Sequence, residues 1–193
     1  MLDITDCRNL SSLQAVVFMM MFLQSSARLS TCYCYIGIAL RASCRLGMHR
    51  NVRHDFDLIE QEERKRIFWM IRKMDAYVSA LLGLPQLLNE DDVDQQLPLE
   101  IDDEFITANE VISAPTGHFH LAVASNEQTK LMRILQKVVR YIYPVTQGQA
   151  GPRETYSISQ SRIREIETDL QIWMDALPME LRPSDNAPVE LTR

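Results

Sequence analysis

The densest group of residues that could do chemistry is the carboxylate cluster in "NEDDVD", at residues 89–94. Carboxylate oxygens are the ligands that Ca²⁺ and Mg²⁺ prefer, but an EF-hand loop needs alternating acids, then a glycine at position six and a glutamate at position twelve. No frame of this segment offers that combination. A small all-α metal-dependent enzyme would need Asp91, Asp92 or Asp94 to converge with His or Glu from elsewhere, and the sequence shows no such convergence. We interpret the segment as a solvated acidic loop.

The histidines are the next candidates, since His118 and His120 are two residues apart. Such a pair could bind zinc from a β-strand. We predict instead that a helix starts near residue 119, and no cysteine or carboxylate motif lies nearby in the sequence. These two residues, like the isolated His49 and His54, are therefore interpreted as exposed or hydrogen-bonded loop residues.

The four cysteines, Cys7, Cys32, Cys34 and Cys44, contain no C-x-x-C pair. Cys32 and Cys34 would point to different sides of a helix and could not share a metal ion. We interpret all four as free, partly buried thiols in a reducing compartment.

Motifs for covalent or phosphate chemistry are absent from the sequence. "GQAG" lacks the lysine and the strand–loop–helix setting of a phosphate-binding loop, and there is no G-x-S-x-G. Cys44 and His49 could act as nucleophile and base, but no third partner is visible. The sequence therefore predicts that this chain is not an enzyme, with no catalytic, cofactor-binding or metal-binding residues.

Methionines give a different kind of candidate. Met19, Met20 and Met21, with Met70 and Met74, could line an adaptable pocket or a groove for a partner, because the thioether is flexible and polarisable. We favour the interpretation that they fill the core. In an all-α domain the two interpretations overlap.

The composition excludes several classes of protein. The chain has 193 residues, is 46% hydrophobic and carries a formal net charge of −6, which does not suit a surface that must pair with phosphates. The most apolar run, "AVVFMMMFL" at residues 15–23, is shorter than the about 20 residues of a membrane span, so we predict a helix buried on most sides. No secretory signal is visible, and we expect a soluble intracellular protein without membrane contact.

Apolar residues recur at helical spacing and nowhere in sustained alternation, which predicts an all-α fold without substantial sheet. We expect a multi-helix bundle or helical-hairpin array of five to six main helices. The clearest ones cover residues 11–29, 31–48, 58–82, 119–143 and 159–177. Asp57 can cap the third helix, and Gly83 and Pro85 end it.

An ordered set of short motifs surrounds that third helix. A-x-R-x-x-x-x-L-G-x-H-R ends the second helix, E-R-K-R-I-F-W opens the third, and an aspartate, L-G-x-P and an acidic stretch with L-P follow; L-x-x-W-x-x-x-L-P comes late in the chain. This set resembles the regulatory "middle homology" domain of fungal zinc-binuclear-cluster transcription factors. The signature positions are Arg41, Gly47, His49, Arg50, Glu63, Arg64, Arg66, Trp69, Asp75, Gly83, Pro85, Pro98 and Trp173.

Two positions depart from the family pattern. Ala76 stands where the family usually has a basic residue, and Lys65 replaces an arginine. We hypothesise that Asp75 accepts hydrogen bonds from Arg41 or Arg45 and so ties the second helix to the third. These residues would then build the scaffold.

The resemblance implies a signal-receiving regulatory domain of a nuclear factor that controls transcription by RNA polymerase II. DNA binding and zinc would belong to an N-terminal six-cysteine cluster outside this chain, which itself would hold no cofactor. The implied partners are the transcription machinery or co-regulators, a small-molecule inducer, and, as one option, a second copy in a homodimer. Residues 1–145 would form the core of the domain, residues 146–156 a linker, and residues 157–193 its C-terminal helix and polar tail.

A second hypothesis is a helical protein-interaction scaffold without a ligand. Its sign would be an apolar groove between helices rather than an enclosed cavity. Because the family domain normally has further helices on both sides, we also expect this chain alone to expose apolar surface.

Overall fold

The computed structural model describes residues 7–52, 56–142 and 159–182, and over these ranges it contains five α-helices and no strand. The helices are α1 (Leu10–Ser25), α2 (Leu29–Arg45), α3 (Leu58–Leu82), α4 (Leu121–Ile142) and α5 (Gln160–Ala176). Short 3₁₀ turns are η1 (Glu90–Asp92), η2 (Asp103–Phe105) and η4 (Met179–Leu181). The predicted all-α class is confirmed. The predicted linker, residues 146–156, lies outside the described residues.

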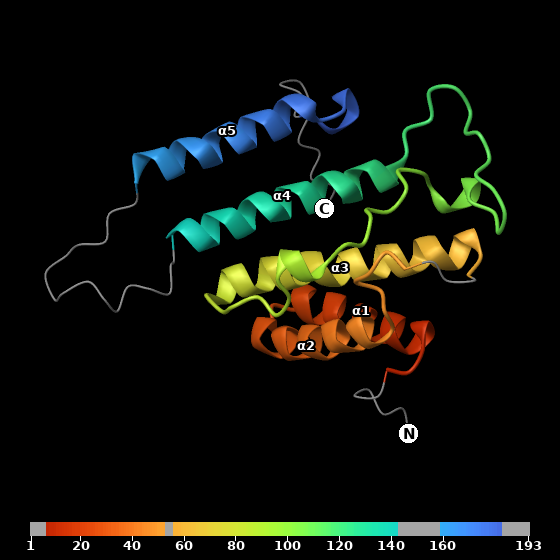
Figure 1. Cartoon of the computed structure of the whole chain (residues 1–193), viewed down its shortest axis with the longest axis horizontal. Coiled ribbons are helices and arrows are strands. Elements are labelled where there is room, and N and C mark those ends of the chain that lie inside the picture. Colours follow the sequence, from red (N-terminus) through yellow and green to blue (C-terminus); the bar gives the residue numbers. More distant parts are fainter. Residues whose placement is uncertain (1–6, 53–55, 143–158, 183–193) are drawn as a thin grey trace, which may run out of the picture.

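The helices form a stack (Figure 1). α1, α2 and α3 pack against one another, α4 packs on α3, and α5 packs on α4. The segment between α3 and α4 runs back along α3, so that α4 begins near the end of α3 that comes first in the sequence (Figure 1). Within the described ranges, no helix is long and apolar enough to cross a bilayer.

The first two helices meet at a different place from the one predicted. Asn9 and Ser12 form a reciprocal capping box at the start of α1, but this helix ends at Ser25 and not near residue 29. Ala27 then adopts a left-handed conformation, with φ 57°, and lets the chain turn into α2. Because the turn uses alanine where glycine is the usual signal, the sequence pattern did not reveal it.

The third helix has the predicted bounds because both of its ends carry strong signals. The Asp57 side chain accepts a hydrogen bond from the Glu60 backbone N–H, 2.8 Å from donor to acceptor. Gly83 ends the helix with φ 66°, a conformation that costs little without a Cβ. α3 is thereby fixed as the central helix, in contact with α1, α2 and α4.

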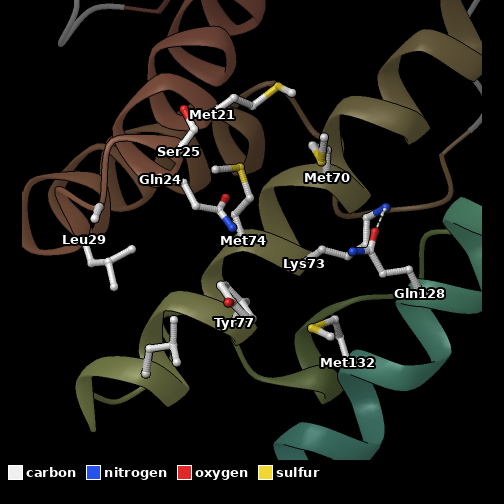
Figure 2. Close-up of a pocket in the computed structure, with 12 residues that line it drawn as sticks. Met21, Gln24, Ser25, Leu29, Met70, Lys73, Met74, Tyr77, Gln128 and Met132 are labelled. Carbon is white, nitrogen blue, oxygen red and sulfur yellow. Dashed lines mark hydrogen bonds between the residues drawn. The ribbon is translucent and has the colours of Figure 1, made fainter. Parts of the chain in front are cut away.

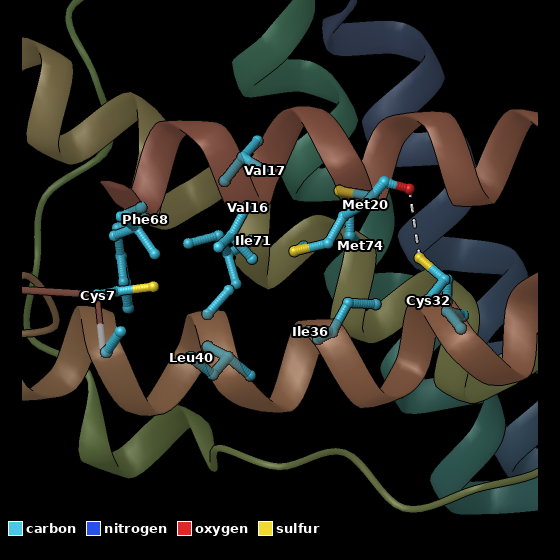
Figure 3. Close-up of a cluster of buried hydrophobic side chains, with 14 of the residues drawn as sticks. Cys7, Val16, Val17, Met20, Cys32, Ile36, Leu40, Phe68, Ile71 and Met74 are labelled. Atoms are coloured by element: carbon cyan, nitrogen blue, oxygen red, sulfur yellow. Dashed lines mark hydrogen bonds between the residues drawn. The ribbon is translucent and has the colours of Figure 1, made fainter. Parts of the chain in front are cut away.

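A continuous apolar core lies among α1, α2 and α3 (Figure 3). Its fully buried side chains include Leu13, Met20, Ile36, Phe68 and Ile71. The Cys32 thiol lies in this core and donates to the Met20 carbonyl at 3.5 Å. The four cysteines form no disulfide within the described residues. Cys7 and Cys32 are buried and Cys44 is half-buried, whereas Cys34 is exposed and not, as predicted, partly buried.

One prediction about α1 is wrong. Phe18 is 70% exposed and Phe22 is 65% exposed, so the apolar helix is buried on one side and open on the other. At 3.6 residues per turn, Phe18, Met21 and Phe22 share a face that no described element covers fully. The expected exposure of apolar surface is thus found on α1.

Candidate functional site

A groove of about 690 Å³ opens between α1, α3 and α4. Its side chains come from helices far apart in the sequence (Figure 2). Those of α1 and the turn after it, with the first residue of α2, are Met21, Gln24, Ser25, Ala27 and Leu29; those of α3 are Met70, Lys73, Met74, Tyr77 and Leu81; those of α4 are Gln128 and Met132. The volume falls in the range of small-molecule sites. We call this feature the methionine groove.

Thioethers dominate the walls of the methionine groove. Met21 comes from α1, Met70 and Met74 from α3, and Met132 from α4 (Figure 2). Met74 belongs to the buried core, with 4% exposure, whereas Met21 is 42% exposed. The sequence analysis favoured core filling over a pocket for Met21, Met70 and Met74. Met74 does both, Met70 lines the groove and packs against the core, and Met21 lines the groove only. Such walls adapt to apolar ligands of different shapes.

A buried cation lies at one side of the methionine groove. Lys73 is 7% exposed, and its Nζ donates to Ser125 Oγ at 2.8 Å and to Gln128 Oε1 at 3.2 Å. Burial lowers the pKa of this ammonium group. In the described part of the chain, no carboxylate oxygen lies within 4.0 Å of it. The groove therefore combines apolar walls with the positive charge of Lys73, whose hydrogen-bond acceptors are all uncharged groups.

The segment after α3 is held to that helix by charged and polar side chains. They are Glu62, Arg66, Trp69, Arg72 and Asp75, and all but Arg66 are buried. Their partners are backbone groups of Leu99, Ile101, Gln96, Leu88 and Leu87, in that order. A buried backbone N–H or C=O without a partner costs free energy. These side-chain hydrogen bonds satisfy the backbone groups of an irregular segment and so let it lie against the helix.

The hypothesis that Asp75 binds Arg41 or Arg45 is wrong. Asp75 is fully buried and accepts from the Leu87 backbone N–H at 3.2 Å and from Ser79 Oγ at 3.3 Å. Its nearest cation is Arg72, at 3.9 Å between Nη1 and Oδ2. Burial raises the pKa of this carboxyl group, although the Leu87 N–H and Arg72 oppose the rise. Arg41 instead bonds the Gly37 carbonyl of its own helix, at 3.3 Å.

Other signature residues also make contacts between segments. Arg64 donates to the Leu46 carbonyl at 2.6 Å, Arg50 pairs with Asp94 at 3.2 Å, and the Arg66 guanidinium pairs with Asp103. The carbonyl groups of Pro85 and Pro98 accept from Tyr33 and Asn126, and Trp173 Nε1 donates to the Glu127 carbonyl at 3.2 Å. Gly47, like Gly83, has a positive φ, His49 is half-buried, and Glu63 is exposed. None of the signature residues lines the methionine groove.

The sequence analysis did not identify most of the buried charges. Besides Asp75 they are Glu62, Arg72, Lys73 and Glu127. Glu62 is 2% exposed and accepts from Leu99 N–H at 2.7 Å and from Lys65 at 2.7 Å. A charged residue on a helix is usually solvated, so only the fold around these positions distinguishes them.

The acidic residues of 89–94 do not converge on a metal site. Asp94 pairs with Arg50, and Glu90 pairs with Arg133 at 3.1 Å. Among the described residues, the metal-binding side chains that do converge are Asp102, His118 and His120, at the other end of the loop. This cluster lies outside the methionine groove.

Comparison with known protein families shows which family this chain belongs to. Residues 2–175 match the family described as "Fungal specific transcription factor domain". The chain belongs to this family. No solved structure matches it.

Several fungal relatives extend this result. The chain is 42% identical to Activator of stress genes protein 1 of Candida albicans over 96% of its own length, and 42% identical to Activator of stress genes 1 of Saccharomyces cerevisiae over 95%. It is 30% identical to Transcriptional activator protein acu-15 of Neurospora crassa over 89%. The chain covers 20%, 19% and 18% of these three proteins, so it corresponds to about a fifth of each.

Proposed function

We propose that this chain is the signal-receiving regulatory part of a fungal zinc-cluster transcription factor that controls transcription by RNA polymerase II in the nucleus. The match over residues 2–175 and relatives named as activators support this assignment. In the whole factor, DNA binding would be carried by a six-cysteine zinc cluster outside this chain. The chain's net charge of −6 agrees with a role other than gripping DNA.

The observation that carries the signalling role is the methionine groove. We propose that a small, mainly apolar inducer binds there and bridges α1, α3 and α4, which are brought together at this point. An inducer that contacts all three helices would favour the arrangement in which they lie together over more open ones. Co-regulators or the transcription machinery would then bind the favoured arrangement. In this role the chain has no catalytic function, in keeping with relatives that are named as transcription regulators.

Filling the methionine groove tests this role. In the full-length factor, Met21→Trp would occupy the groove with an indole, and we expect the inducible expression of a reporter gene to be lost or to become constitutive. Met174→Trp is the matched control, because Met174 is on a helix and is 48% exposed, close to the 42% of Met21, but lies outside the groove. Equal responses of the two variants, at equal protein abundance, would contradict the proposal.

The second candidate is a helical protein-interaction scaffold, and one observation favours it. The groove is open, and the exposed face with Phe18 and Phe22 is on the same helix as Met21. A protein partner would cover this face as well as the groove. Phe18→Ser should then impair the reporter response as strongly as Met21→Trp does, whereas an inducer confined to the groove predicts an effect of Met21→Trp alone.

A further inference from the structure

The strongest unassigned feature is the cluster where the loop after α3 meets the start of α4. His118 Nε2 lies 3.1 Å from Asp102 Oδ2, and His120 Nδ1 lies 3.5 Å from the same oxygen. Glu104 Oε1 lies 4.0 Å from His118 Nε2. The ligand atoms of Asp102, His118 and His120 all lie within 4.8 Å of one another.

We propose that Asp102, His118 and His120 form a zinc site whose fourth position is open to water. In a tetrahedral zinc site with bonds of about 2 Å, neighbouring ligand atoms are about 3.3 Å apart. The observed contacts of 3.1 and 3.5 Å to Asp102 Oδ2 bracket this spacing. Glu104 reaches only His118, at 4.0 Å, and is not one of the three converging ligands.

The two reasons that argued against zinc in the sequence do not hold in the fold. Residues 118–120 precede α4, which begins at Leu121, so they are not helical. The missing carboxylate is supplied by Asp102, 16 positions before His118, because the loop brings its two ends together. Both histidines therefore face one carboxylate.

Zinc would replace hydrogen bonds that the ligand atoms make in this structure. The Asp102 backbone N–H donates to His120 Nδ1 at 3.2 Å, so this nitrogen carries no proton, and its lone pair would turn from the N–H to the metal. His118 Nε2 lies 3.1 Å from Asp102 Oδ2, and zinc would take the place of the proton between these two atoms.

Neighbouring groups hydrogen-bond and pack against the proposed ligands and so fix their orientation. The backbone N–H of Ala122 donates to Asp102 Oδ1 at 3.2 Å, which fixes the carboxylate and turns Oδ2 toward the histidines. The ring of Phe105 contacts both imidazoles edge-on, with centroids 5.0 Å from His118 and 5.4 Å from His120. Such an apolar wall limits solvent access and holds the imidazoles in place.

Zinc binding to the 193-residue chain tests the proposal. The reduced chain is freed of metal by dialysis against a chelator and titrated with zinc chloride in competition with a chromophoric chelator. We expect one zinc ion per chain and a higher melting temperature with zinc. Since loss of a group that only hydrogen-bonds a metal ligand weakens metal binding about 10- to 100-fold, His118→Ala and His120→Ala should each lower the affinity at least about 10-fold.

Two controls separate this site from other zinc ligands. His49→Ala, at a histidine outside the cluster, and Cys34→Ser, at the exposed thiol, should keep the wild-type affinity. Cobalt should give visible d–d bands without a thiolate charge-transfer band. Circular dichroism of the metal-free variants shows whether they fold.

The proposal would be overturned by any of three results. They are a wild-type chain that retains no zinc, a folded His118→Ala/His120→Ala double variant that binds zinc as tightly as the wild type, and a cobalt complex with thiolate bands. If the single variants do not fold, His118→Gln, which keeps the size and polarity of the side chain, replaces His118→Ala with the same expectation.

Discussion

The three-helix bundle of α1–α3 and the pair α4–α5 are built on different principles. In the bundle, side chains such as Leu13, Ile36 and Phe68 are fully buried in one apolar core. In α5, Ile172 is 62% exposed and Met174 is 48% exposed. The bundle therefore buries more apolar surface than α5 does, since no residue of α5 is fully buried.

Polar side chains join the two helices of the outer pair. Lys137 of α4 bonds Asp169 of α5 at 2.6 Å and also pairs with Glu165. The Trp173 indole donates to the Glu127 carbonyl at 3.2 Å. Exposed ion pairs contribute little stability, so the position of α5 is set more weakly than that of α1 or α2.

The largest effect should come from the bundle core. Phe68→Ala removes a fully buried ring that packs edge-on against Trp69, and we expect a loss of about 3–5 kcal/mol in the free energy of unfolding. Leu170→Ala in α5, where the side chain is 37% exposed, should cost about 1 kcal/mol. Urea denaturation followed by circular dichroism measures both. Equal losses would show that the two regions share one core.

The next effect concerns the junction between the two regions, where Lys73 joins α3 to α4. Replacing a buried charge by an apolar side chain of similar size often stabilises a protein, so Lys73→Met should raise the free energy of unfolding at neutral pH by about 1 kcal/mol. Arg164→Met is the control, because it removes a cation from an exposed helical position, on α5. A loss of stability in Lys73→Met would show that the bonds to Ser125 and Gln128 outweigh the burial of the charge.

The same variant predicts a dependence on pH. Burial lowers the pKa of Lys73 in the folded protein, so the folded state releases this proton at a lower pH than the unfolded state does. Between the lowered folded pKa and the usual 10.5, the unfolded state binds more protons, and wild-type stability rises relative to Lys73→Met. The advantage of Lys73→Met should therefore be largest at neutral pH and disappear above the unfolded pKa. Melting curves of both proteins in matched buffers measure this difference.

The sequence predicted those parts of the fold that depend on local signals. The bounds of α3 follow from Asp57 and Gly83, whereas its apolar period identifies only part of its buried surface, since Tyr77 and Leu81 are exposed and Lys73 is buried. The turn at Ala27 was missed because a left-handed alanine has no sequence signature. Phe18 and Phe22 were predicted to be buried because hydrophobicity indicates a face for packing and does not say whether this chain supplies the neighbour.

The candidate site depends on contacts that no local pattern specifies. The methionines of α1 and α3 were recognised, but Met132 joins them only because α4 packs on α3. Asp75 was assigned to Arg41 or Arg45 because these cations were the nearest candidates on a neighbouring helix, whereas its partners are Leu87 and residues of its own helix. Buried charges on α3 look like a solvated face until the returning loop is placed over them.

The smallest effect should come from the ion pairs of the outer helices. The carboxylates of Asp169 and Glu165 raise the pKa of Lys137, which keeps it charged at every pH used for stability measurements. Because water reaches all three side chains, Lys137→Met should lower the melting temperature slightly in low salt and less in high salt, where the attraction is screened. Arg140→Met removes the same charge from an exposed position on α4 and should show a weaker dependence on salt. A large loss for Lys137→Met that persists in high salt would mean that α4 and α5 are joined by packing, and the contrast with the bundle would then be one of degree.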